Sequence, residues 1–113
     1  MVIIMNKFLR SIVVITSLFT VPAVQAKTFS LTVVNKTSSI VEAVYASPTG
    51  EDDWEEDLLG DKAINIGGRY TVRFKDDRKV CRYDLRFEFR DTNFEPLEDT
   101  QNLCEIEEYE ITE

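Results

Sequence analysis

An acidic run between positions 51 and 61 holds most of the groups in this sequence that could do chemistry. Its carboxylates belong to Glu51, Asp52, Asp53, Glu55, Glu56, Asp57 and Asp61. Calcium takes about six to eight oxygen ligands, and the candidate ligands are Asp52, Asp53, Asp57 and Asp61. The spacing is not that of an EF-hand, because the sixth position counted from Asp53 is Leu58 rather than glycine. A solvated acidic turn explains the same residues, so both interpretations stay open.

Trp54 lies in the middle of this acidic run. A large apolar ring among carboxylates is either buried as an anchor or offered to a partner. A binding surface for another protein is therefore a third interpretation of the run. Its candidate residues are Trp54, Asp52, Asp53, Glu55, Glu56 and Asp57.

The first 26 residues have the organisation of a cleavable signal peptide. Lys7 and Arg10 form a basic start, residues 12–24 are largely apolar, and Ala26 ends the segment with a small side chain. The alternative is an uncleaved membrane anchor, but the apolar run is shorter than the roughly 20 residues that a bilayer crossing needs. Cleavage would leave residues 27–113 as a single domain in the periplasm or outside the cell.

The charge balance limits the partners of this domain. The chain has 21 acidic and 13 basic residues, and removal of the predicted signal peptide with Lys7 and Arg10 changes the net charge from −8 to −10. Phosphate backbones and anionic lipid surfaces repel such a domain. We therefore expect no nucleic-acid partner and no membrane insertion. A basic protein, such as a lysozyme-like hydrolase, is the candidate partner, although the acidity also serves solubility.

Cys81 and Cys104 are the only cysteines of the chain. In an oxidising compartment such a pair most simply forms one disulfide. By loop-closure entropy, the roughly 23-residue loop would stabilise the fold by about 3 kcal/mol. A domain of this size buries only about 60 to 65% of its unfolded surface, so its stability is marginal without such a cross-link.

The usual catalytic groups are missing. The chain contains no histidine, and a disulfide would occupy both thiols, so the commonest general base and thiol nucleophile are absent. A carboxylate pair could act on a glycosidic bond, but so small a domain rarely offers the deep cleft that this reaction needs. We expect a non-enzymatic protein with no cofactor other than a possible calcium ion.

Apolar and polar residues alternate with a period of two through most of residues 27–113, most clearly from 80 to 90. Cys81, Tyr83, Leu85, Phe87 and Phe89 share one face, and charges of alternating sign occupy the other. This pattern predicts a strand with one face in a core and one in water. Further strands are predicted at 29–34, 40–46, 63–66, 69–74 and 103–111, and Pro96 indicates an edge or interrupted strand. Six or seven short strands predict an all-β fold, a small antiparallel β-sandwich.

Residues 47–62 interrupt this alternation. Acidic residues at the start of the segment 51–60 and Gly60 at its end predict a short helical turn. Trp54 and Leu58 would share a face of this turn and plug one end of the sandwich. The aromatic residues of the strands are expected in the core, and they are Tyr45, Tyr70, Phe74, Tyr83, Phe87 and Phe89.

Several segments in order resemble a family of small exported proteins of Gram-negative bacteria. They are Val34-Asn35-Lys36-Thr37, Tyr45-Ala46-Ser47-Pro48, Trp54, Asp57-Leu58-Leu59-Gly60, Cys81-Arg82-Tyr83-Asp84-Leu85-Arg86 and Asn102-Leu103-Cys104. The resemblance spans most of the chain after residue 26. It implies periplasmic or secreted residence and a small disulfide-closed β-domain, and it carries over no catalytic residues.

Overall fold

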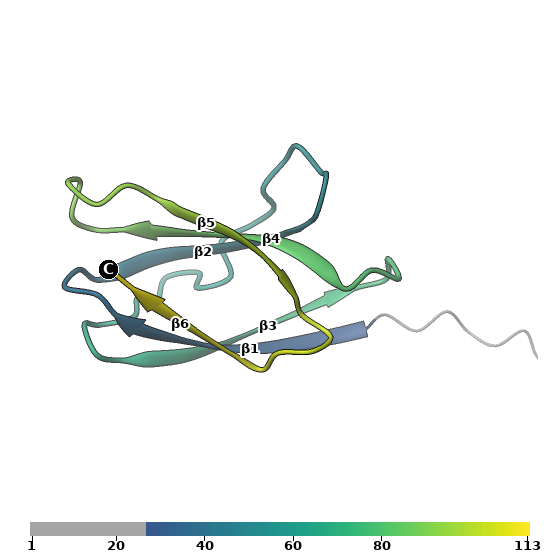
Figure 1. The fold of residues 1–113 in the computed structure, drawn as a ribbon, viewed down its shortest axis with the longest axis horizontal. Coiled ribbons are helices and arrows are strands. Elements are labelled where there is room, and N and C mark those ends of the chain that lie inside the picture. The colour runs from purple at the N-terminus through teal and green to yellow at the C-terminus, as the bar shows by residue number, and fades with distance from the viewer. Residues whose placement is uncertain (1–26) are drawn as a thin grey trace, which may run out of the picture.

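The computed structural model describes residues 27–113 and arranges them as six strands in two layers (Figure 1). The strands are β1 (Lys27–Lys36), β2 (Val41–Pro48), β3 (Arg69–Asp76), β4 (Arg82–Phe89), β5 (Leu97–Asn102) and β6 (Glu108–Thr112). The predicted all-β sandwich is confirmed, as is the disulfide between Cys81 and Cys104. The predicted signal peptide falls on residues 1–26, outside the described part of the chain.

The strands form two three-stranded sheets, one in the order β3-β1-β6 and the other in the order β2-β4-β5. Neighbouring strands are antiparallel except β1 and β6, which run parallel with Thr32 aligned with Glu108. The first and last strands of the domain are therefore partners in one sheet (Figure 1). Pro96 directly precedes β5, which is an edge strand as its proline predicts.

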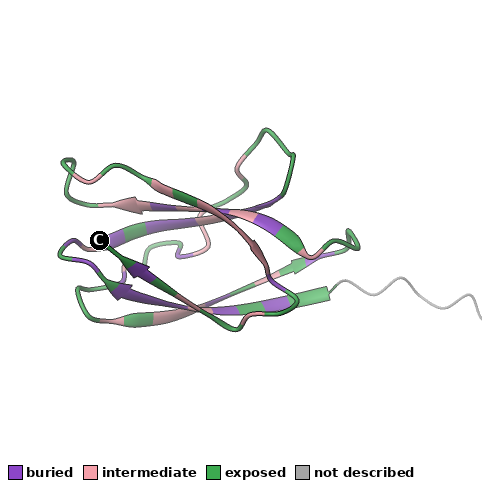
Figure 2. Cartoon of the chain, in the orientation of Figure 1, coloured by how far each residue is buried: buried purple, intermediate pink, exposed green. Residues whose placement is uncertain are grey.

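The core lies between the sheets and follows the predicted alternation. In β4, Tyr83, Leu85 and Phe87 are at most 1% exposed, whereas the residues between them are half-buried. Figure 2 shows the same alternation of buried and exposed residues along β1. Burial of each large apolar side chain contributes about 1.5 to 3 kcal/mol, so the inward faces of these strands hold the two sheets together.

Tyr45 does not reach the core, so this part of the aromatic prediction is wrong. β2 has a bulge between Val41 and Ala43, and the extra residue reverses the alternation beyond it. Val44 and Ala46 therefore face the core, and Tyr45 lies half-buried outside it. The other predicted aromatics are buried in the core or pack against it, namely Tyr70, Phe74, Tyr83, Phe87 and Phe89.

Residues 47–62 contain no helix, and the predicted helical turn is wrong. The segment bonds to β2 instead. The carboxylate of Asp57 accepts hydrogen bonds from the backbone N–H groups of Val44, at 2.9 Å, and Leu59, at 3.0 Å. A tight turn follows, in which Gly60 has a φ of 61°, a left-handed conformation that favours glycine.

The same segment covers the outer edge of β2. The N–H of Leu58 donates to the carbonyl oxygen of Val44 at 2.7 Å, and Val41 and Ile64 exchange two backbone hydrogen bonds of 3.0 and 2.9 Å. The strand predicted at 63–66 is reduced to this single bridge. Because an unpaired edge can pair with another chain, this cover closes one side of the β2-β4-β5 sheet.

Candidate functional site

The acidic run lies in an exposed loop after β2, which rises above the upper sheet in Figure 1. We call residues 49–57 the acidic loop. Its exposed carboxylates belong to Glu51, Asp52, Asp53, Glu55 and Glu56, and Asp61 is exposed in the turn that follows. Trp54 and Asp57 are half-buried. The loop thus presents most of the predicted site residues to solvent and turns two of them toward the protein.

Trp54 holds the acidic loop against β2. Its ring packs on Tyr45 with centroids 6.3 Å apart. Nearby, the hydroxyl of Ser47, a residue only 2% exposed, donates to the carbonyl oxygen of Asp53 at 3.1 Å. The pKa of Tyr45 is raised by burial and then by the carboxylates around it. Trp54 is therefore an anchor for the loop, as one interpretation of the sequence predicted, and the bulge that turns Tyr45 outward provides its partner.

Arg78 ties the acidic loop to the turn between β3 and β4. Its guanidinium lies 2.8 Å from the Glu55 carboxylate and 4.0 Å from that of Glu51. It also donates through Nε to Asp76 at 2.8 Å. The bonds to Asp76 and Glu55 raise the pKa of Arg78. An isolated exposed ion pair contributes little, but one guanidinium shared by three carboxylates fixes the loop relative to the core.

Asp76 connects this cation to the core, a role that the sequence pattern did not indicate. It is 6% exposed and accepts hydrogen bonds from the hydroxyl of Tyr83 and from the backbone N–H of Arg78. Burial alone would raise the pKa of Asp76, but the hydrogen bonds from Arg78 and Tyr83 outweigh it and lower the pKa from 3.8 to about 2. Burial and the bond to Asp76 raise the pKa of Tyr83. Asp76 lies just beyond the strand predicted at 69–74, and the alternation of residues indicated no buried partner for it.

Three aromatic rings surround the buried end of this network. Phe29, Phe74 and Tyr83 have centroids 5.1 to 5.5 Å apart. They leave the Tyr83 hydroxyl facing Asp76, so one side chain joins the apolar core to the charged loop. An acidic residue at the end of one strand and a tyrosine on the inward face of the next are the signal that could have indicated this pair.

The four predicted calcium ligands do not converge. Within residues 27–113, no group of three or more acidic, cysteine or histidine side chains is arranged to hold a metal ion. Asp57 already accepts two backbone hydrogen bonds through one oxygen. Asp52, Asp53 and Asp61 are exposed. This geometry assigns Asp57 a structural role.

Asp57→Ala is expected to lower the free energy of unfolding by about 1 to 3 kcal/mol, because it leaves two backbone N–H groups without an acceptor. Urea unfolding measures this loss. Asp61→Ala is the matched control, since it removes an exposed aspartate from the same segment, and a change within about 0.5 kcal/mol is expected.

The same variants test the calcium prediction. Thermal unfolding in calcium and in chelator, at fixed ionic strength, should give equal melting temperatures for the parent and both variants. A calcium-dependent rise in the parent that both variants lose would instead identify a metal site built on these aspartates.

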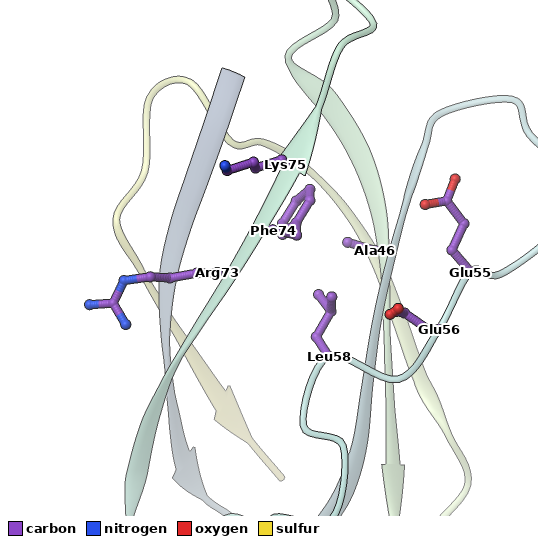
Figure 3. A pocket seen from close by; sticks show the side chains of 7 residues that line it. All are labelled: Ala46, Glu55, Glu56, Leu58, Arg73, Phe74 and Lys75. Atoms are coloured by element: carbon purple, nitrogen blue, oxygen red, sulfur yellow. The ribbon is translucent and has the colours of Figure 1, made fainter. Parts of the chain in front are cut away.

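A cleft of about 290 Å³ separates the acidic loop from β3 (Figure 3). Ala46, Leu58 and Phe74 point into it, and Glu55 and Glu56 lie on the loop side. Arg73 and Lys75 extend from the opposite side of β3. The cleft thus has an apolar floor between the acidic loop and β3, and the two cations of β3 point away from it.

The disulfide joins the residue before β4 to the turn after β5. Cys81 and Cys104 have their Cα atoms 5.3 Å apart, and the N–H of Leu103 donates to the carbonyl oxygen of Cys81 at 2.8 Å. The ammonium of Lys27 lies 3.3 Å from the sulfur of Cys104. Residues 27–113 contain no free thiol.

Comparison with models of protein families, with curated proteins and with solved structures found no match. The resemblance to small exported proteins of Gram-negative bacteria stays a prediction.

Residues 27–113 include no helix that is long and apolar enough to cross a membrane.

Proposed function

We propose that this protein is an exported, non-enzymatic binding module that recognises a basic protein through the acidic loop. The observation that supports the proposal best is that five exposed carboxylates lie on a short loop anchored at two points. Trp54 packs on Tyr45 and Arg78 pairs with Glu55. A loop already held in one conformation loses less entropy on binding. Export follows from the predicted signal peptide and would place the module in the periplasm or outside the cell.

The charge of the domain supports a basic partner. Without residues 1–26 the net charge is −10, and an acidic surface accelerates encounter with a cationic one. Asp52, Asp53 and Glu56 are exposed and form no ion pair within residues 27–113. They are therefore available to lysines and arginines of a partner.

The triple variant Asp52→Asn, Asp53→Asn, Glu56→Gln is expected to weaken binding to a basic lysozyme, used as the probe, by about tenfold or more. Titration at low salt and at about tenfold higher salt should also show that the parent loses most of its affinity as salt rises. The substituted carboxylates support no part of the fold, so the melting temperature should stay unchanged.

The matched control carries the same charge change elsewhere, through Glu95→Gln, Glu105→Gln and Glu107→Gln. All three residues are exposed. Equal weakening by both triple variants would show attraction by net charge without a site. Affinity that does not respond to salt would contradict the proposal.

A further inference from the structure

The outer edge of β3 is unpaired, unlike the outer edge of β2. Asn35 donates its N–H to the carbonyl of Gly68, toward β3, and Thr32 donates its N–H to Glu107, away from β3. Hydrogen-bonded pairs alternate along an antiparallel ladder. Thr71, Arg73 and Lys75, the β3 residues opposite Thr32, Ser30 and Thr28, therefore direct their N–H and C=O groups away from β1.

These backbone groups have no hydrogen-bond partner within residues 27–113. β3 is an edge strand, and the cleft described above runs beside it (Figure 3). On the far side of the cleft, β2 is covered by the segment that contains Leu58. The cleft thus offers free backbone groups along β3, while β2 is covered beside it at Val41 and Val44.

The side chains of β3 differ between its two faces, so a strand that paired with this edge would have different neighbours on each face. Phe74 points into the cleft beside Leu58, and Arg73 and Lys75 point to the other side (Figure 3). Both cations are exposed, and neither forms an ion pair within the described residues. A pairing strand would therefore meet an apolar surface on one face and two uncompensated cations on the other.

We propose that the free edge of β3 binds an extended segment of a partner protein as an added strand. The segment carries acidic residues at the positions beside Arg73 and Lys75 and apolar residues at the alternate positions that face Phe74 and Leu58. Backbone hydrogen bonds supply affinity in this mode, and the alternate side chains supply specificity. The proposal is independent of binding by the acidic loop.

Charge favours this occupant over a second copy of the chain. Antiparallel pairing of two β3 edges would bring Arg73 and Lys75 of one copy close to the same residues of the other. Like charges on facing strands are destabilising. An acidic strand meets the same residues with opposite charge.

The probe is a peptide of about six residues, the usual length of a strand, in which Glu alternates with Val. A peptide in which Lys alternates with Val is its control. Both peptides are titrated into the purified protein, which is labelled with nitrogen-15 so that individual amides can be followed. The Glu peptide is expected to bind at least about tenfold more tightly than the Lys peptide. Hydrogen exchange at the amides of Thr71, Arg73 and Lys75 is expected to slow by about tenfold or more on binding.

Arg73→Ala and Arg73→Pro form a matched pair, because both remove the charge and only proline also removes the free N–H. This N–H makes no bond to β1, so proline is tolerated at the edge. The alanine variant should bind the Glu peptide about tenfold more weakly than the parent, and the proline variant should not bind it.

Equal binding by the two variants would overturn the proposal, as would the absence of binding to the parent. If the proline variant does not fold, amide exchange in the parent decides: binding without slower exchange at Thr71, Arg73 and Lys75 also overturns it.

Discussion

Replacement of both cysteines, Cys81→Ser and Cys104→Ser, is expected to lower the free energy of unfolding by about 3 kcal/mol. For a domain of this size, such a loss lowers the melting temperature by more than about 10 °C. The bridge joins positions 23 residues apart, and its main effect is to restrict the unfolded chain. In the folded protein, Arg82 already pairs with Asn102 beside it, so little native structure depends on the bond itself.

Thermal unfolding of the parent, with and without a thiol reductant, is the control for the double variant. The reduced parent should melt close to the variant, because both lack the same cross-link. Intact mass after alkylation should find no free thiol in residues 27–113 of the oxidised parent. An oxidised parent that melts with the variant would show that the bridge does not stabilise the fold.

Asp76→Asn is expected to lower the free energy of unfolding by about 2 kcal/mol near pH 6. The pKa of Asp76 falls from 3.8 to about 2 in the folded protein, and each unit corresponds to about 1.4 kcal/mol. Because the unfolded chain binds the proton more readily, this stability is present above about pH 4 and is lost as the pH falls toward 2. Urea unfolding of the parent and the variant at several pH values measures this effect. The difference between their free energies of unfolding should shrink as the pH falls from about 4 toward 2.

Two further variants test whether the effect belongs to the buried carboxylate of Asp76 and its hydrogen bonds. Tyr83→Phe removes only the hydroxyl that donates to Asp76 and should cost about 1 kcal/mol. Asp77→Asn changes the neighbouring aspartate, which is exposed, and should leave both stability and its acid dependence unchanged. A parent and an Asp76→Asn variant with parallel pH profiles would contradict the role assigned to this carboxylate.

The sequence allowed the fold class and the disulfide to be predicted because both depend on simple patterns. Tyr83, Leu85 and Phe87 alternate with charged residues over a whole strand, and similar short strands along the rest of the chain supply a second sheet to bury such a face. Cys81 and Cys104 had no other cysteine to pair with. These features need no knowledge of how distant parts of the chain meet.

The site was less predictable because its contacts cross between segments. The bulge in β2 that turns Tyr45 toward Trp54 leaves no clear mark in the sequence. Asp57 was expected in a helical turn. Its carboxylate instead accepts backbone hydrogen bonds from Val44 on the edge of β2 and from Leu59, and the segment is not helical. Asp76 follows the strand predicted at 69–74, and only the folded structure brings the hydroxyl of the buried Tyr83 to it. In each example, a tertiary contact overrides the local pattern.

The parallel pairing of β1 with β6 determines when this protein can finish folding. Synthesis makes Lys27–Lys36 well before Glu108–Thr112, yet these strands share a sheet. Pairing between segments so far apart in sequence is slow. The β3-β1-β6 sheet is therefore incomplete until Glu108–Thr112 has been made. For the proposed export route, a sheet that is still incomplete favours a polypeptide able to thread through a narrow membrane channel.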